Sequence, residues 1–375
     1  MRRLSGILSK VLPCVFVWCI LICIAMTACQ EDILTHNPAQ QLTFSHDSLL
    51  FDTVFTNMGS STKRMMVYNP NKNALCIDRV EMKNGKSFYI NLDGENQLDN
   101  MRDITLRGGD SLFLFVRVEI DPQDVNTPVL VEDTIVFHVN QKQHNIYLQA
   151  YGQDVHVIQS KEKFVQYDHW VVENDKPYLI YDTVVVVGNM RIKPGATLYM
   201  HSGAMIYAYG SVTANGSQEQ PIVIRGDRTD MLFDSVPYRV ASGQWNGLYL
   251  VHLADMQTPT YTFDYVDILS GSIGLYAISE STTKCPRLSL SNGRIHNHSI
   301  YGLVLQNIDA TVVNTEISNC ASYCVYLAGG KHNFAHNTIA SYFGYPYTTI
   351  NIHNNILRED VAAVYINNLS KNAAP

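Results

Sequence analysis

The feature that most constrains the fold of this 375-residue chain is a repeat with a step of 22 residues towards its C-terminal end. Ile295, Ile317 and Ile339 follow this step, and the segment has no helical periodicity. Such a period predicts one coil of a β-solenoid per repeat, with the isoleucines filling the interior. Other positions at this step are asparagines, expected to form ladders at the turns, and tyrosines, expected to stack between coils. They are Asn292, Asn314 and His336, Asn297 and Asn319, Tyr301, Tyr323 and Tyr345, and Leu305 with Leu327.

Very short strands separated by turns begin at Thr183, well before the countable repeat. Residues 194–198, 203–206, 214–216, 221–224 and 245–248 resemble the opening coils of the right-handed parallel β-helix, or pectate-lyase-like, superfamily. The resemblance implies a right-handed single-stranded parallel β-helix over residues 183–375. No amphipathic cap follows Ala362, and the pattern is unfinished at Pro375. We expect either a fragment or a last coil that packs on a partner.

Residues 42–155 have the pattern of a β-sandwich, in which strands of roughly six residues alternate with turns. Residues 111–120 alternate strictly between two faces, and residues 133–139 and 145–150 are expected to form a hairpin. The motifs FDTV at 51–54, VYNP at 67–70, LRGGD at 106–110 and LQAYG at 148–152 resemble immunoglobulin-like sandwiches of the major-sperm-protein and ASH kind. That resemblance implies a spacer or docking module. Residues 156–182 are interpreted as a bridging segment that caps the β-helix.

The N-terminus has the three-part pattern of a secretory signal. Arg2, Arg3 and Lys10 precede 16 residues without a charge, from 11 to 26. MTAC at 26–29 resembles the bacterial lipobox, in which the cysteine is diacylated and becomes the mature N-terminus. The uncharged stretch is shorter than the ~20 residues that span a bilayer as a helix, which favours a cleaved signal over an uncleaved anchor. We therefore predict a signal peptide over residues 1–28, lipidation of Cys29, and a tether over residues 29–41.

Acidic residues follow the lipidated cysteine. Glu31 and Asp32 resemble the surface-export signal of lipoproteins in the Bacteroidetes group, and an ordinary polar tether is the competing interpretation. The predicted location is the outer membrane, either exposed at the cell surface or facing the periplasm. The formal charge of the chain is −7, and loss of the signal's three positive residues leaves −10. An acidic surface repels phosphate, so nucleic-acid binding is disfavoured.

Four cysteines remain in the predicted mature chain. They are Cys76, Cys285, Cys320 and Cys324. Their number allows two disulfides, but their apolar neighbours favour buried free thiols. The spacing of Cys320 and Cys324 with His332 and His336 would suit zinc, but these positions coincide with core and ladder positions of the repeat. We therefore predict no metal site and no cofactor, with calcium at Asp227, Asp230 and Asp234 as the alternative.

Catalytic patterns of the superfamily are missing from the sequence. The resemblance implies lyases, which need calcium-binding carboxylates near an Arg or Lys base, and hydrolases, which need paired aspartates. Acids in the countable coils are sparse, and none recurs at the 22-residue step. They are Asp264, Asp267, Asp309, Glu316, Glu359 and Asp360. Because a fold does not fix an activity, we predict a non-catalytic chain.

An insertion over residues 226–243 interrupts the coil pattern and is the candidate binding site. Long excursions from solenoids often build binding surfaces, and aromatic, acidic and arginine side chains suit sugar recognition. The candidate ligand-binding residues are Asp227, Arg228, Asp230, Asp234, Tyr238, Arg239 and Trp245. The competing interpretation is a loop that packs across the junction between the sandwich and the β-helix.

The sequence thus predicts a non-catalytic envelope lipoprotein whose β-helix presents a surface for a ligand, of which polysaccharide is the expected class. Its predicted partners are the membrane, through the N-terminal lipid, and a polysaccharide or an envelope protein. One alternative is a polysaccharide lyase or glycoside hydrolase. The other is a structural component of the envelope that binds protein.

Overall fold

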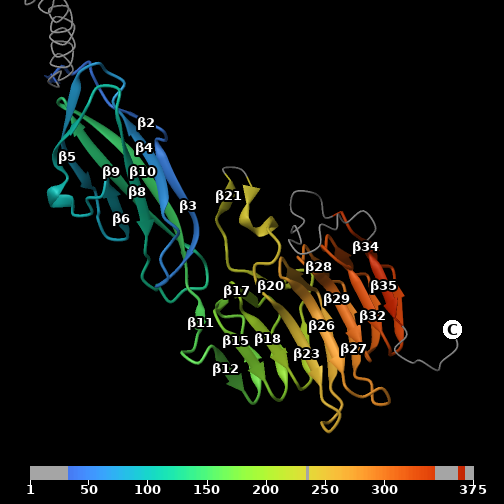
Figure 1. Cartoon of the computed structure of the whole chain (residues 1–375). Helices are drawn as coiled ribbons and strands as arrows, with labels where there is room; N and C mark the ends of the chain where they lie inside the picture. The colour runs from blue at the N-terminus through green and yellow to red at the C-terminus, as the bar shows by residue number, and fades with distance from the viewer. Residues whose placement is uncertain (1–32, 234–235, 343–361, 368–375) are drawn as a thin grey trace, which may run out of the picture. The chain divides into compact units, whose positions relative to one another are not determined.

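A computed structural model describes residues 33–233, 236–342 and 362–367 (Figure 1). The chain divides into two compact units. One contains the described residues up to 50, 60–118 and 132–149, and the other contains 51–59, 119–131 and the described residues from 150 onward. Antiparallel pairing dominates the N-terminal part and parallel pairing the remainder, which confirms the predicted all-β class of a sandwich followed by a parallel β-helix. No helix among the described residues is long and apolar enough to cross a membrane.

The N-terminal part consists of two sheets. The first has the strand order β1-β5-β9-β10-β3 with β7 also paired to β5, and the second has the order β2-β4-β8-β6. The elements are β1 (Leu34–Thr35), β2 (Thr43–Phe44), β3 (Ser48–Phe55), β4 (Lys63–Tyr68), β5 (Ala74–Met82), β6 (Phe88–Leu92), the 3₁₀ turn η1 (Leu98–Asn100), β7 (Arg102–Leu106), β8 (Ser111–Val118), β9 (Val129–Val139) and β10 (Lys142–Gln153).

Strand β8 shows how the sequence pattern builds this core. Leu112, Leu114 and Val116 are buried on one face, whereas Phe113 on the other face is 39% exposed. This alternation confirms the predicted period of two. The ring of Phe44 in the second sheet lies 5.1 Å from that of Phe137 in the first, so the inner faces of the two sheets pack together.

The β-helix consists of three parallel sheets, which we call sheets C, D and E. Successive coils add one strand to each sheet in turn (Figure 1). Sheet C contains β11 (His156–Ile158), β14 (Tyr178–Ile180), β17 (Thr197–Met200), β20 (Ile222–Gly226), β25 (Val266–Leu269), β28 (Arg294–His296), β31 (Glu316–Ser318) and β34 (Thr338–Ala340). Sheet D contains β12 (Phe164–Tyr167), β15 (Thr183–Val186), β18 (Met205–Ala208), β23 (Gly247–His252), β26 (Ile273–Ser279), β29 (Tyr301–Gln306), β32 (Val325–Ala328) and β35 (Val364–Asn367).

Sheet E contains β13 (Trp170–Val172), β16 (Met190–Ile192), β19 (Val212–Asn215), β24 (Thr260–Asp264), β27 (Arg287–Ser291), β30 (Asp309–Val313) and β33 (His332–Ala335). The insertion lies between β20 and β23 and contains β21 (Met231–Phe233), β22 (Val236–Pro237) and the 3₁₀ turn η2 (Tyr238–Val240). The predicted bridging segment, residues 156–182, supplies β11 to β14. Since β11, β12 and β13 each pair in parallel with a strand of the next coil, this segment forms the first coil of the β-helix.

The interior of the β-helix is a stack of aliphatic side chains. Ile295 pairs in register with Ile317, and Ile317 pairs with Ile339, as the 22-residue step predicts. Ile295 and Ile317 are fully buried. Full burial of such a side chain contributes about 1.5–3 kcal/mol, so these stacks supply much of the stability of each coil.

Asparagines and one histidine make the turns between strands. Asn292, Asn314 and His336 have φ values of 52°, 50° and 56°, in the left-handed region that asparagine tolerates better than most residues. The Nδ2 of Asn314 donates to Oδ1 of Asn292 at 2.8 Å, and Asn319 donates to Asn297 at 3.0 Å. The predicted asparagine ladders are confirmed.

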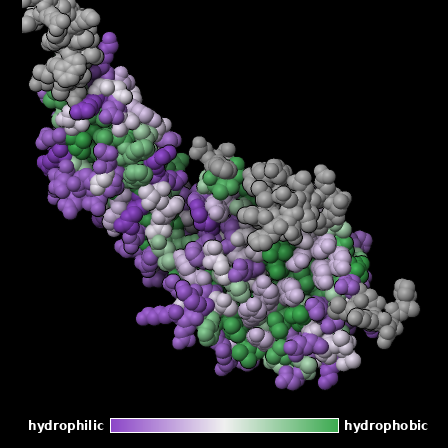
Figure 2. Space-filling model, in the orientation of Figure 1, coloured by the Kyte–Doolittle hydropathy of each residue, from purple (hydrophilic) through white to green (hydrophobic). Residues whose placement is uncertain are grey.

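Tyrosines cover the outer face of sheet D. The rings of Tyr301 and Tyr323 are stacked with centroids 6.1 Å apart, as predicted, and Tyr345 lies outside the described residues. The ring of Tyr249 lies 4.9 Å from Tyr207 on one side and 5.6 Å from Tyr276 on the other. On the face seen in Figure 2, hydrophilic and intermediate residues are mixed with separate hydrophobic groups.

The four cysteines among the described residues are free thiols. Cys320 and Cys324 are buried, as predicted, whereas Cys76 and Cys285 are partly exposed. Burial raises the thiol pKa of both Cys76 and Cys285, which keeps them protonated at neutral pH.

Candidate ligand-binding site

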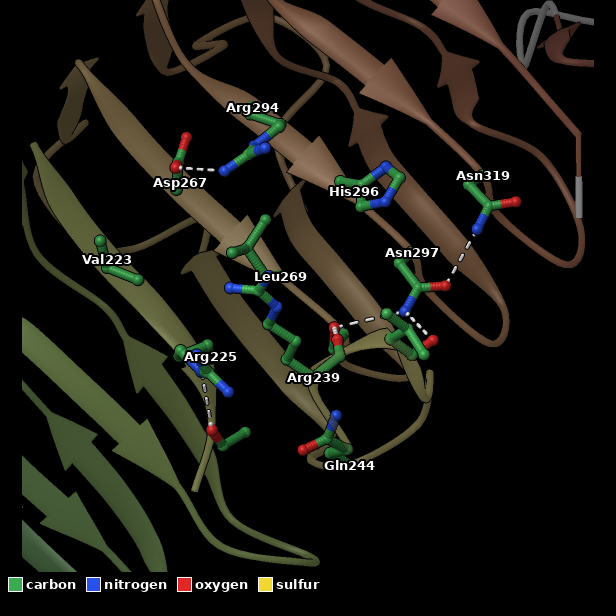
Figure 3. A pocket seen from close by; sticks show the side chains of 13 residues that line it. Val223, Arg225, Arg239, Gln244, Asp267, Leu269, Arg294, His296, Asn297 and Asn319 are labelled. Atoms are coloured by element: carbon green, nitrogen blue, oxygen red, sulfur yellow. Dashed lines mark hydrogen bonds and ion pairs between the residues drawn. The ribbon is translucent and has the colours of Figure 1, made fainter. Parts of the chain in front are cut away.

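A pocket of about 600 Å³ lies on the outer face of sheet C, beside the insertion (Figure 3). In a strand, alternate side chains point outward, so the outward residues of β20, β25 and β28 form its floor. They are Val223, Arg225, Asp267, Leu269, Arg294 and His296. The wall comes from the insertion and from turn residues, namely Gly226, Arg239, Val240, Gln244, Ser270, Asn297 and Asn319.

Side chains from the coils fix the backbone of η2 over this floor. The Ser270 hydroxyl donates to the carbonyl of Arg239 at 2.7 Å, and Asn297 Nδ2 donates to the carbonyl of Val240 at 2.7 Å. Gln244 Nε2 donates to the carbonyls of Tyr238 and Ala241. The exposed Arg239 side chain is thereby directed toward Leu269, in the middle of the pocket (Figure 3).

The pocket lining carries an excess of positive charge. Arg294 forms an ion pair with Asp267 at 2.7 Å. Among the described residues, Arg225 and Arg239 have no carboxylate at ion-pair distance, and burial lowers the pKa of Arg225. Arg225 Nε donates to the carbonyl of Gly226 at 3.2 Å, which orients its guanidinium. Three guanidinium groups therefore face one carboxylate.

A second hollow continues along the same face. It has a volume of about 320 Å³, shares Asp267 and Arg294 with the first, and includes Glu316 on the next strand. Arg294 pairs in register with both Asp267 and Glu316, so charges of alternating sign follow one another on β25, β28 and β31. This hollow has an almost entirely polar lining of side chains and turn backbone.

A hydrogen-bonded chain connects Glu316, Ser318 and His296. The Ser318 hydroxyl donates to Glu316 Oε1, and His296 Nδ1 lies 2.8 Å from Ser318 Oγ. His296 Nδ1 also lies 3.7 Å from Glu316 Oε1. Burial lowers the pKa of His296 below the usual imidazole value, although Glu316 acts in the opposite direction.

Of the six predicted ligand-binding residues that the structure describes, only Arg239 lines the pocket. Asp227 pairs with His201 at 2.6 Å. Arg228 pairs with Asp230 and lies 4.0 Å above the ring of Tyr238, so these three side chains satisfy one another. Asp234 lies outside the described residues.

The structure corrects the role expected for Trp245. Its side chain is fully buried, and its Nε1 donates to the carbonyl of Leu269 at 2.9 Å. The indole therefore fills the core beneath the pocket and cannot stack on a sugar. Within the described residues, no three His, Cys, Asp or Glu side chains are arranged to hold a metal ion.

Sequence reasoning missed most of the pocket. Arg294 and Glu316, and likewise His296 and Ser318, are separated by the 22-residue step, which could have placed them side by side. Asp267 and Arg294 are separated by 27 residues instead, so that pair leaves no periodic signal.

Comparison with known proteins gives no family. No family model matches the chain, and no curated protein matches it. Among solved structures, the chain is similar to a family 123 glycoside hydrolase from Clostridium perfringens, with 7% identity and a TM-score of 0.22 over 30% of this chain and 26% of that one. It is also similar to the VesB protease of Vibrio cholerae, with 14% identity and a TM-score of 0.22 over 30% of this chain and 32% of that one. A third similar structure is an ASH/PapD-like domain of human CEP192. It is 11% identical, with a TM-score of 0.21 over 33% of this chain and 91% of that domain. The chain spans about a quarter and a third of the first two, and TM-scores this low carry no inference about function.

Proposed function

We propose that this chain binds a polysaccharide in the pocket on sheet C. The observation that carries the proposal is the lining, in which Arg225, Arg239 and Arg294 face one carboxylate in a chain of formal charge −7. A locally cationic pocket in an acidic protein attracts anionic groups. Arginine also binds carboxylate and sulfate groups through two parallel hydrogen bonds, so an anionic glycan is the best match.

Acceptors in the wall support a ligand that also carries hydroxyl groups. Gln244 Oε1 and Asn319 Oδ1 are buried and have no donor among the described residues. A buried acceptor without a donor costs about 1–3 kcal/mol, which a small shift of the wall and a ligand hydroxyl would offset. Sugars combine hydroxyl donors with acceptor oxygens, whereas a simple anion offers acceptors alone.

The dimensions suit a chain rather than a small molecule. Lining residues come from β20, β25, β28 and the turn after β31, which are four successive coils. At about 4.8 Å between neighbouring strands, these coils extend ~14 Å along the β-helix axis. The adjoining polar hollow continues in the same direction, so the ligand can lie along the face of sheet C.

Calorimetric titration of the full-length chain with paired neutral and anionic polysaccharides tests the proposal. We expect binding that Arg239→Gln weakens at least tenfold. Arg287 is a matched control, because it is also an exposed arginine on an outer strand face but lies on sheet E. Arg287→Gln should bind normally. Absence of binding to every polysaccharide, or equal weakening by both variants, would contradict the proposal.

We also propose that the chain is an outer-membrane lipoprotein anchored at Cys29, with its ligand in the cell envelope or outside the cell. The support is the signal pattern of residues 1–29, which lie outside the described residues. Metabolic labelling with a fatty acid should mark the wild-type chain and not Cys29→Ser. Protease treatment of intact cells separates surface exposure from periplasmic orientation.

A further inference from the structure

The hydrogen bonds around Ser318 define the tautomer of His296. The Ser318 hydroxyl has one proton and donates it to the Glu316 carboxylate. Its oxygen can therefore only accept from His296 Nδ1, which must carry the ring proton of the neutral imidazole. The lone pair of His296 is then on Nε2, which has no hydrogen-bond partner among the described residues.

This arrangement holds an imidazole base at the edge of the pocket. The His296 side chain is 29% exposed and lines the pocket between Arg294 and Asn297 (Figure 3). Ser318 is 1% exposed, so its contact with His296 is shielded from water. Glu316 acts on Nδ1 of His296 through the Ser318 hydroxyl. A carboxylate in this position orients the imidazole ring and stabilises the imidazolium that forms when Nε2 takes a proton. Binding a glycan by its charge alone would not require a carboxylate that orients the imidazole in this way.

We propose that His296 is a general base that hydrolyses a carboxylic ester carried by the bound glycan. This inference rests on the proposed glycan binding and goes beyond it, because the pocket then alters its ligand. Ser318 and Glu316 are positioning residues that act through His296. The guanidinium of Arg239 faces the same pocket and would hold the oxyanion of the reaction.

Ester hydrolysis fits this set of groups better than cleavage of the sugar chain. Hydrolysis of a glycosidic bond uses two carboxyl groups, and the two described carboxylates on this face are already engaged, Asp267 by Arg294 and Glu316 by Ser318. Activation of water needs only a neutral imidazole and a donor for the oxyanion.

The reaction balances without a further reactant. As the oxygen of a water molecule bonds to the ester carbonyl carbon, Nε2 of His296 takes one proton from it. The carbonyl π electrons move to the oxygen, and this oxyanion faces the guanidinium. When the carbonyl re-forms, the bond from the carbonyl carbon to the alcohol oxygen breaks. The alcohol leaves with the electron pair and takes the proton from Nε2, which restores the neutral imidazole and yields a carboxylic acid.

The ester can be an acyl group on a sugar hydroxyl or an alkyl ester of a sugar carboxylate, so the test has two arms. The full-length chain is incubated with O-acetylated polygalacturonate and with partly methyl-esterified polygalacturonate, and released acetate or methanol is measured by NMR. We expect release from one substrate and a loss of about 100- to 10,000-fold in kcat/KM for His296→Gln. His156→Gln is the matched control, because His156 also pairs with a carboxylate, Asp175 at 2.9 Å, but does not line the pocket.

Further variants separate catalysis from a structural role. Ser318→Ala should move the inflection of the pH profile of kcat/KM to lower pH, because the imidazolium loses an acceptor, and Ser318→Thr should restore it. If His296→Gln lowers the thermal midpoint, the wild-type profile decides, since a flat profile through the imidazole range would overturn the inference. No release from either ester by a chain that still binds glycan would overturn this inference alone. Absence of both binding and release would overturn the binding proposal as well.

Discussion

The outer faces of sheets C and D belong to the same coils, but they differ in whether their side chains find partners within the protein. On sheet D, Tyr249 stacks on Tyr207 and contacts Tyr276 at a tilt, and Tyr326 stacks on Tyr365 at 5.2 Å. These side chains use one another as partners. On sheet C, Arg225, Asp267 and Arg294 are charged outward residues, and the pocket wall holds buried acceptors that have no donor among the described residues. One face is therefore complete in itself, and the other offers contacts that a ligand can complete.

The insertion contributes to this difference. It enters between β20 of sheet C and β23 of sheet D, and its turn η2 is bonded to Ser270 and Asn297 on later coils. Arg239 and Gln244 add a wall to the row of outward side chains that forms the floor of this pocket. The regular coils supply a rigid floor, and the insertion supplies part of the concave wall that ligand sites need.

The largest predicted effect concerns stability beneath sheet C. His298 is fully buried, accepts from the backbone N–H of Gly271 and lies 3.1 Å from the carbonyl of Ile268, and burial lowers its pKa to about 4. Since the folded-state pKa lies below that of the unfolded chain, the unfolded chain binds the proton first as the pH falls. Stability is then lost from about pH 6.5 down to pH 4, by up to ~3 kcal/mol.

Denaturant unfolding at pH 7 and pH 4.5 measures this loss. His298→Gln should be less stable at pH 7 but should lose less stability on acidification than the wild type. If the two chains had the same pH dependence, the stability lost on acidification would be due to another group and not to His298.

The repetitive parts of the molecule could be predicted from sequence, and the pocket could not. Ile295 and Ile317 or Asn297 and Asn319 are one coil apart, and residues one coil apart share a position on the tube. A constant step in the sequence therefore identifies residues that are neighbours in space. The same logic predicted the stacked Tyr301 and Tyr323.

In the insertion, sequence spacing no longer indicates position in space, and composition alone predicts the positions of its residues poorly. Trp245 was expected at the ligand surface because it is aromatic and follows charged residues, but the chain has already returned to the core at this point. Arg228 and Asp230 pair with each other, which composition cannot distinguish from pairing with a ligand. Arg239 was identified, but its position over Leu269 depends on hydrogen bonds from residues up to 57 positions later in the chain.

The second prediction sharpens the contrast by measuring affinity. Arg294→Gln removes one of three guanidinium groups and leaves Asp267 unpaired in the pocket. Affinity for an anionic glycan should fall by about 2 kcal/mol, roughly 30-fold, because hydrogen bonds to charged groups are worth ~1.5–3 kcal/mol. The thermal midpoint should change little, since the Arg294 side chain is 44% exposed and the Asp267 side chain 26% exposed, so solvent screens the pair. Calorimetric titration checks the affinity, with Lys331→Gln, directly before β33 of sheet E, as the control.

The third prediction is the converse on sheet D. Tyr249→Ala removes two ring contacts, each worth about 0.5–1.5 kcal/mol, and should lower the free energy of unfolding by about 1–2 kcal/mol. Glycan affinity should remain unchanged, because Tyr249 does not line the pocket. If the variant lost affinity and kept its stability, sheet D and not sheet C would bind the glycan.

The smallest effect tests the turn that borders the polar hollow of sheet C. Asn314 has a φ of 50° and donates to Asn292, so its backbone conformation and its side chain each favour this residue. Asn314→Gly keeps the backbone accessible and loses only the side-chain hydrogen bond, whereas Asn314→Ala loses both. The alanine variant should therefore be less stable than the glycine variant by about 1 kcal/mol, the approximate cost of a left-handed conformation for a residue with a Cβ. Equal stabilities in urea unfolding would show that the turn relaxes to a negative φ, and the shape of the hollow would then not depend on the asparagine ladder.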